Sequence, residues 1–106
     1  MPDVSREMQG LIKRDNCVLL IIDIQEKLIP VISDKERVIE NAIRLSCFAR
    51  ITGIPVILTE QARLGLTLPE VKKELPHVQA ISKVHFNCFF CNEFSEEIKK
   101  NKNGII

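Results

Sequence analysis

Two charged residues stand at the ends of two predicted strands, and together they could do acid–base chemistry. Asp23 follows the apolar run 17–22, and Lys83 follows a shorter predicted strand at 78–82. If the strands are parallel, their carboxyl ends meet at one edge of the sheet, where ligands bind in open α/β folds. A carboxylate beside an ammonium group can activate a nucleophile or stabilise an anion. The same pair could equally be a structural ion pair, and the spacing alone leaves both interpretations open.

The strands that would position this pair have the pattern of strands buried on both faces. The run 17–22 is entirely apolar, and the run 54–60 is nearly so. Such runs, without polar alternation, are typical of a parallel sheet covered by helices. A long amphipathic segment separates them, so the sequence predicts a strand–helix–strand unit and an α/β fold. Residues 104–106, Gly-Ile-Ile, have the composition that begins a fourth buried strand.

The helix between the first two strands has start and stop signals. Ser33 and Glu36 have the spacing of a capping box, and Gly53 is the predicted C′ residue, two positions before Pro55. Apolar residues recur between them near the helical period, and we expect these to face the core: Val38, Ile39, Ala42, Ile43, Leu45, Ala49 and Ile51.

The remaining segments are shorter. Pro69 opens a predicted helix that stops before Pro76, and a second amphipathic helix at 92–100 should direct Phe94 and Ile98 inward. Residues 1–15 are predicted to be a solvated lead-in that contains a short helical turn.

Size and composition limit the class of protein. A chain of 106 residues is one domain at most, and 45% apolar with 27% charged residues is ordinary for a globular protein. The net charge of +1 offers no electrostatic case for binding nucleic acid or an anionic membrane. No apolar run could span a bilayer, the first residues lack a signal segment, and the four cysteines do not form a secreted disulfide pattern. We therefore expect a cytoplasmic protein without membrane or nucleic-acid partners.

The loop after Asp23 argues against nucleotide cofactors. It reads Gln-Glu-Lys-Leu-Ile-Pro and contains no glycine. A loop that cradles phosphate needs the close backbone approach that glycine permits. A dinucleotide site or a phosphate-binding loop is not expected here, and no cofactor is implied.

Three segments, in order along the chain, resemble one family. Residues 20–26 (LIIDIQE) resemble the first-strand signature of the isochorismatase-like cysteine hydrolases. Residues 53–61 (GIPVILTEQ) with 64–70 (LGLTLPE) are similar to the second-strand segment of one branch, and residues 81–89 (ISKVHFNCF) to the family's lysine motif. The resemblance is collinear and covers nearly the whole chain from Asn16 onward.

The resemblance implies a three-layer αβα, Rossmann-like fold with a parallel sheet of about six strands, of which this chain holds three and the start of a fourth. Residues 1–106 would be the N-terminal portion of a single hydrolase domain. The resemblance also implies an Asp–Lys–Cys triad in which Asp23 is the base and Lys83 the lysine. The cysteine would attack a small amide or related carbonyl substrate and form a thioester, which water then cleaves.

The sequence departs from the family in two places. The family's cysteine lies beyond the fourth strand, in a segment that these residues do not contain, and neither Cys88 nor Cys91 stands at that position. Relatives of the nicotinamidase type carry an Asp-x-His metal motif where this chain reads Glu60-Gln61-Ala62, so no metal site is expected. If the chain ends at Ile106, the first strand loses a neighbour, and an exposed sheet edge favours oligomers or a complementing partner.

Other residues are candidates with two interpretations each. Gln25 and Gln61 could orient Asp23 or the substrate, or could be solvated loop residues. Phe86 and Phe89 could line the substrate pocket or belong to the core.

The pair Cys88 and Cys91 has Cys-x-x-Cys spacing. Two phenylalanines between the thiols favour a packed apolar turn over a redox motif or a zinc half-site. His85 is expected to be a pocket-wall or hydrogen-bonded residue rather than a base.

Two classes of function therefore stay open. The first is a hydrolase whose cysteine lies outside the 106 residues. The second is a non-catalytic α/β module or pseudoenzyme that acts by binding another chain. They differ in one respect that can be measured, because only the hydrolase depends on Asp23 and Lys83.

Overall fold

The fold is built on a sheet of parallel strands in the order β3-β2-β1-β4. The computed structural model describes residues 14–100 and 104–105. The strands are β1 (Cys17–Ile22), β2 (Val56–Gln61), β3 (Ala80–Lys83) and the short β4 (Gly104–Ile105). The predicted α/β class and the start of a fourth strand are confirmed. The lead-in predicted for residues 1–15 lies almost wholly outside the described residues, apart from the 3-10 turn η1 (Arg14–Asn16).

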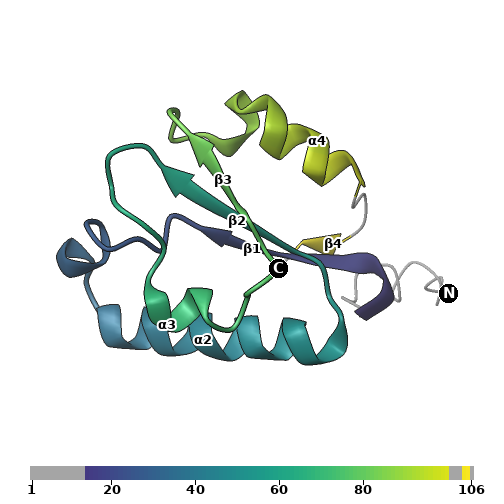
Figure 1. Cartoon of the computed structure of the whole chain (residues 1–106), viewed down its shortest axis with the longest axis horizontal. Helices are drawn as coiled ribbons and strands as arrows, with labels where there is room; N and C mark the ends of the chain where they lie inside the picture. The colour runs from purple at the N-terminus through teal and green to yellow at the C-terminus, as the bar shows by residue number, and fades with distance from the viewer. Residues whose placement is uncertain (1–13, 101–103, 106) are drawn as a thin grey trace, which may run out of the picture.

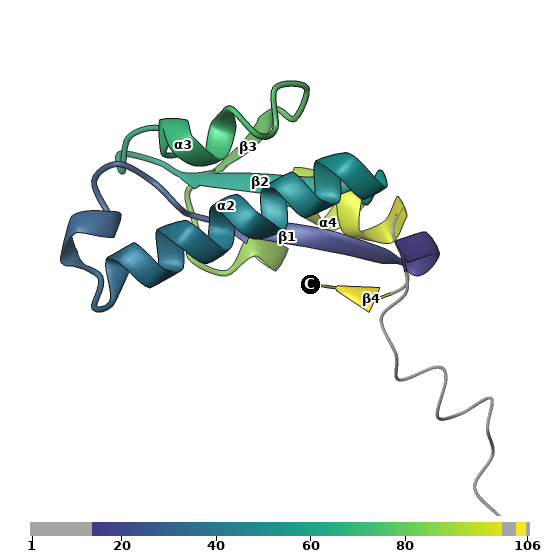
Figure 2. The same cartoon turned by 90° about the horizontal axis from the view of Figure 1, so that it is seen from below.

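Helices cover both faces of this sheet, which gives three layers. The long helix α2 (Lys35–Thr52) and the short helix α3 (Pro69–Lys72) lie on one face, and α4 (Asn92–Lys100) lies on the other (Figure 1). In the view from below, α2 lies in front of the sheet and crosses β1 and β2 (Figure 2). Two further 3-10 turns, η2 (Ile29–Val31) and η3 (Cys88–Phe90), lie in the connections. In the part of the chain that the structure describes, none of the helices has the length and apolarity needed to cross a bilayer.

Strand β1 is buried from both sides, as its sequence predicts. Cys17, Leu19 and Ile21 pack into the cluster beneath α2 and α3, while Val18 and Leu20 pack into the cluster beneath α4. Alternate side chains of a strand point to opposite faces, so both faces must be apolar when helices cover both.

Helix α4 has the predicted bounds and the predicted inward residues. Phe94 is 1% exposed, and Ile98 packs against the same cluster. Burying a side chain of this size contributes about 1.5–3 kcal/mol relative to leaving it in water. Phe94 therefore anchors α4 on the sheet.

The end of α2 is as predicted, but its start is not. Gly53 has φ +77°, a left-handed conformation that glycine adopts without a steric penalty, and its N–H donates to Ala49 O. At the other end the N-cap residue is Asp34, with φ +60° and no side-chain cap hydrogen bond. The capping box predicted at Ser33 and Glu36 is therefore wrong.

The face that α2 buries is narrower than its apolar pattern predicts. Its fully buried residues are Ala42, Ser46 and Ala49, whereas Leu45 is 42% and Ile51 71% exposed. Small side chains along one stripe let the helix backbone approach the sheet closely, and the larger residues on either side then lie outside the contact. The expectation that Leu45 and Ile51 face the core is therefore wrong in the structure of residues 14–100 and 104–105.

The second and third strands each begin two residues later than predicted. Val78 still belongs to the turn after α3, because its N–H donates to Leu75 O at 3.1 Å. Strand β3 then pairs with β2 in a register that places Lys83 opposite Gln61. Lys83 is consequently the last residue of the strand rather than the residue after it.

Candidate active site

The predicted pair meets at the carboxyl edge of the sheet. Lys83 Nζ donates to Asp23 Oδ2 at 2.9 Å, from residues 60 positions apart in the chain. The Lys83 side chain is 0% exposed, and that of Asp23 is 14% exposed. A buried ammonium is tolerated only when it is paired and hydrogen-bonded. The two charges are thus one unit, of which only the carboxylate reaches solvent.

A threonine on the neighbouring strand holds the other carboxylate oxygen. Thr59 is fully buried, and its Oγ1 donates to Asp23 Oδ1 at 2.9 Å. The backbone N–H of Asp23 donates to Thr59 O at 3.3 Å, and Asp23 has φ +58°, a left-handed conformation that aspartate adopts more readily than most residues. Sequence reasoning did not single out Thr59 for this role. The available signal was a hydroxyl close to the end of an otherwise apolar strand.

The ammonium of Lys83 has a full set of acceptors. Besides Asp23, it donates to Gln61 Oε1 at 2.7 Å and to His85 O at 3.1 Å, with Phe86 O farther away at 3.4 Å. An ammonium group has three protons, and the three nearest acceptors occupy them. Lys83 is therefore fixed against the carboxylate and has no proton left over for a substrate.

The two glutamines are buried and bonded to each other. Gln25 Oε1 accepts from Gln61 N at 2.7 Å, while Gln25 Nε2 donates to Gln61 O at 3.0 Å and to Gly65 O at 2.8 Å. Gln25 is 0% and Gln61 7% exposed, so the alternative of solvated loop positions is wrong for both. The side-chain amide of Gln25 thus joins the loop after β1 to the end of β2 and the loop that follows it. The side-chain amide of Gln61 must direct its oxygen toward Lys83, because an ammonium can only donate.

Further contacts hold the loop after β2. Glu60 Oε2 accepts from both Thr67 N and Thr67 Oγ1 at 2.8 Å, which ties this loop back to the end of β2. Gln25 and Thr67 form an isolated antiparallel bridge, which joins the same loop to the loop after β1.

The aromatic residues after β3 lie at the rim. Phe86 is 86% and Phe89 60% exposed, so the alternative that they belong to the core is wrong. The ring of Phe89 contacts that of Phe94 edge-on with 5.4 Å between centroids, and His85 contacts Phe90 in the same way at 5.6 Å. The exposed rings form an apolar rim beside the charged pair, and their role toward a substrate stays a prediction.

The thiol nearest this pair is not poised as a nucleophile. Cys88 is buried, and burial raises its pKa, an effect that the positive charge of Lys83 opposes only in part. A raised pKa leaves less thiolate, which is the attacking form. The four cysteines are free. Across residues 14–100 and 104–105, no three His, Cys, Asp or Glu side chains lie close enough together to hold a metal ion.

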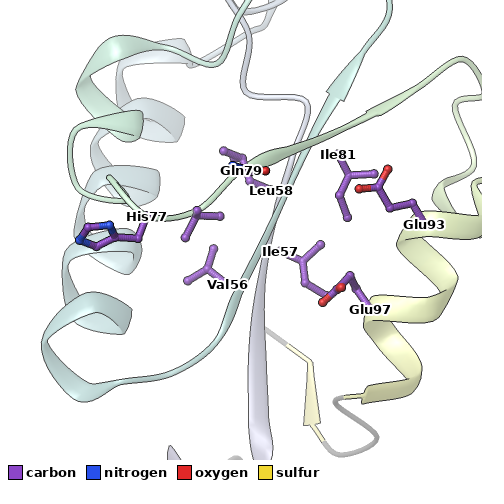
Figure 3. A pocket seen from close by; sticks show the side chains of 9 residues that line it. Val56, Ile57, Leu58, His77, Gln79, Ile81, Glu93 and Glu97 are labelled. Atoms are coloured by element: carbon purple, nitrogen blue, oxygen red, sulfur yellow. The ribbon is translucent and has the colours of Figure 1, made fainter.

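The surface also has a hollow away from this pair. A cavity of about 400 Å³ is lined from the beginning of β2 and β3 and from α4, with Glu93 and Glu97 facing the sheet (Figure 3). In the parallel register Val56 lies beside Leu19, near the amino ends of the strands. Asp23 and Lys83 stand at the carboxyl ends, so this cavity does not belong to the charged pair.

The model of the isochorismatase domain matches residues 17–105. The chain belongs to the isochorismatase family. Among curated proteins it is similar to isochorismatase domain-containing protein 2 of Danio rerio, at 43% identity over 74 residues, and to protein 2A of Mus musculus, at 33% over 87 residues. These alignments cover 66% and 80% of the chain but only 38% and 40% of the relatives.

Solved structures of the isochorismatase-like fold agree with the architecture. The MAR1 ribonuclease from Caenorhabditis elegans superposes with a TM-score of 0.78 at 32% identity, over 90% of this chain and 51% of that one. The YcaC gene product from Escherichia coli, an octameric hydrolase of unknown specificity, gives 0.75 at 22% identity, over 87% of this chain and 48% of that one. The chain thus spans about half, or less, of the length of the proteins it matches.

Proposed function

We propose that residues 1–106 are the N-terminal portion of a single cysteine-hydrolase domain, and that Asp23 and Lys83 are two members of its Asp–Lys–Cys triad. The substrate would be a small amide or a related carbonyl compound. The observation that carries this proposal is the contact of 2.9 Å between Lys83 Nζ and Asp23 Oδ2 at the edge where α/β folds bind ligands. The carboxylate is the member that solvent and substrate can reach.

In this proposal Asp23 moves the protons. A cysteine supplied from outside the 106 residues gives its thiol proton to Asp23, and its sulfur attacks the carbonyl carbon. The leaving amine takes that proton as the carbon–nitrogen bond breaks and a thioester remains. Water then attacks the thioester carbonyl carbon while Asp23 accepts its proton. The carbon–sulfur bond breaks, the carboxylic acid is released, and Asp23 returns the proton to the departing thiolate. Each carboxylate oxygen keeps a lone pair beyond those used by Lys83 and Thr59, so the base can act while it is held.

The remaining polar groups position rather than react. Lys83 fixes the carboxylate and supplies a positive charge that favours a nearby thiolate. Gln61 fixes Lys83, and Gln25 fixes the end of strand β2, where Gln61 lies. We assign the apolar part of the substrate to the rim formed by Phe86 and Phe89. Gln25 and Gln61 are buried, and we propose that they serve substrate binding by holding the site in shape.

RNA is the competing substrate, because one similar structure is a ribonuclease. The site offers RNA little attraction, because its cation is 0% exposed and paired with a carboxylate, and the net charge of the chain is only +1. Phosphate contacts need accessible Lys or Arg side chains. Carbonyl hydrolysis is the better fit.

Self-association is part of the same proposal. Within the described residues, β4 pairs only with Cys17 and Val18 of β1, so the rest of that edge of β1 has no strand beside it. An open apolar strand edge is a site of pairing with another chain. We infer that the remaining strands of the proposed domain cover this edge, and we propose that the protein forms a homo-oligomer, as the octameric YcaC gene product does.

The test begins with the intact mass of the protein from its source, which shows whether a segment follows Ile106. The protein at its natural length is then assayed on a panel of small amides and esters, and on RNA. Because positioned proton transfer contributes about 10²–10⁴-fold to rate, Asp23→Asn should lower kcat/KM by at least about 10² on the preferred carbonyl substrate. The 106 residues alone should show no turnover.

Asp34→Asn and Lys73→Met are the matched controls. Asp34 shares the left-handed backbone of Asp23 but is an exposed residue at the start of α2, paired with Arg37, and Lys73 is an exposed lysine. Both controls should keep full activity. Full activity of Asp23→Asn, a longer protein without a cysteine after Ile106, or cleavage of RNA alone would each refute the triad assignment.

A further inference from the structure

Cys88 and Cys91 form a pair that the proposed hydrolysis does not use. They bracket the 3-10 turn η3, and the N–H of Cys91 donates to Cys88 O at 2.9 Å. A hydrogen bond with this spacing closes a turn whose end Cα atoms lie less than about 7 Å apart. A disulfide spans Cα separations of about 4.4–6.8 Å. The backbone therefore already holds the two cysteines at a separation that a disulfide can bridge.

The two side chains also point to the same place. Cys88 belongs to the cluster formed with Ile81 and Phe94, and Cys91 packs against that cluster from its rim. Cys91 Sγ has only a weak contact, 3.9 Å from Ser82 O, which is a small obstacle to reorientation.

We propose that Cys88 and Cys91 are a peroxide-sensitive modification site, in which oxidation joins the two sulfurs in a disulfide beside Lys83. Cys91 reacts first because it is the more exposed of the two. Its thiolate attacks hydrogen peroxide, a sulfur–oxygen bond forms, the oxygen–oxygen bond breaks and hydroxide leaves. Cys88 then attacks the sulfenic sulfur, the sulfur–sulfur bond forms and the oxygen departs as water with the thiol proton. In sum, two thiols and one peroxide give a disulfide and two waters.

The position of the disulfide connects it to the charged pair. The same loop supplies His85 O and Phe86 O to the ammonium of Lys83. A bond across η3 fixes the end of that loop and removes Cys91 Sγ from Ser82 O, the residue that precedes Lys83. Oxidation should therefore change the environment of Lys83. Formation of the disulfide and its effect on Lys83 do not depend on the proposed hydrolase activity, so either can be refuted while the hydrolase proposal stands.

The experiment is peroxide treatment of the folded chain, followed by trypsin under non-reducing conditions. Cleavage after Lys83 and Lys99 gives peptide 84–99, which contains both thiols. The expected product is this peptide lighter by two hydrogen atoms and restored by a reductant. Cys91→Ser should abolish it, and Cys47→Ser, at the other partly exposed cysteine, should leave it unchanged.

Two outcomes overturn the modification site. One is Cys91 carrying added oxygen with no link to Cys88, and the other is a dimer joined through Cys91. The connection to the pair is measured separately, from the NMR signals of the Lys83 side chain before and after oxidation. A disulfide that leaves those signals unmoved would overturn the connection. Should Cys91→Ser fail to fold, Cys91→Ala provides the same comparison.

Discussion

The ion pair between Asp23 and Lys83 makes a quantitative prediction about stability. Lys83→Met removes the ammonium but keeps a side chain of similar length in a position that is 0% exposed. It leaves Asp23 Oδ2, Gln61 Oε1 and His85 O without the donor that Lys83 supplied. Breaking a buried pair by removing one partner typically costs about 3–5 kcal/mol, because the other charge is left uncompensated. We expect a loss of that size in the free energy of unfolding.

The coupling between the two residues separates the pair from simple packing. At 2.9 Å, two unit charges attract by about 6 kcal/mol at an effective dielectric constant of 20, and dehydration offsets part of this. Asp23→Asn combined with Lys83→Met should therefore cost less than the sum of the single changes, by about 3 kcal/mol, which is near the upper end for residues in contact.

Urea unfolding of the 106-residue chain, followed by circular dichroism, measures all four proteins of this cycle. Unchanged m values would show that the variants unfold from the same compact state. Lys73→Met controls for the substitution at an exposed lysine and should change stability by less than about 0.5 kcal/mol. Additive single changes, or a cost for Lys83→Met below about 1 kcal/mol, would refute the view that the charges form one buried unit.

Three further predictions concern groups around the pair. Thr59→Val keeps the shape of the side chain but removes the donor to Asp23 Oδ1, and thermal unfolding should show a loss of about 1–3 kcal/mol that Thr59→Ser largely avoids. Gln25→Leu removes the acceptor of Gln61 N and the side-chain donor to Gln61 O and Gly65 O, so hydrogen exchange at Gln61 N should become at least about tenfold faster, whereas a protected Gln61 N would contradict the role of Gln25 as a brace. Among the residues that the structure describes, the buried Ser46 Oγ has no hydrogen-bond partner, so Ser46→Ala should stabilise the chain by up to about 1 kcal/mol in urea unfolding; a destabilised variant would show that the hydroxyl is bonded after all.

Much of the fold follows from the sequence alone. Helices cover both faces of β1, so every residue of the strand must be apolar. This requirement is visible in six consecutive residues, which have no polar alternation. The end of α2 at Gly53 and the extent of α4 also depend on residues close together in the chain. A glycine cap and an amphipathic period can both be recognised from such residues. The same logic placed Asp23 and Lys83 at one edge, because parallel strands end together.

The identity of the partners around the pair was settled only by the tertiary structure. Which oxygen Lys83 bonds depends on the register between β2 and β3, and a shift of one residue would turn Gln61 to the other face. Thr59 meets Asp23 across 36 residues, and the carbonyls of His85 and Phe86 carry no signature in residue type. The buried stripe of α2 is a further example. Ser46 is buried and Leu45 is exposed because of how closely the helix approaches the sheet. Local pattern thus determined which residues reach the edge, whereas packing between distant segments decided what each of them touches there.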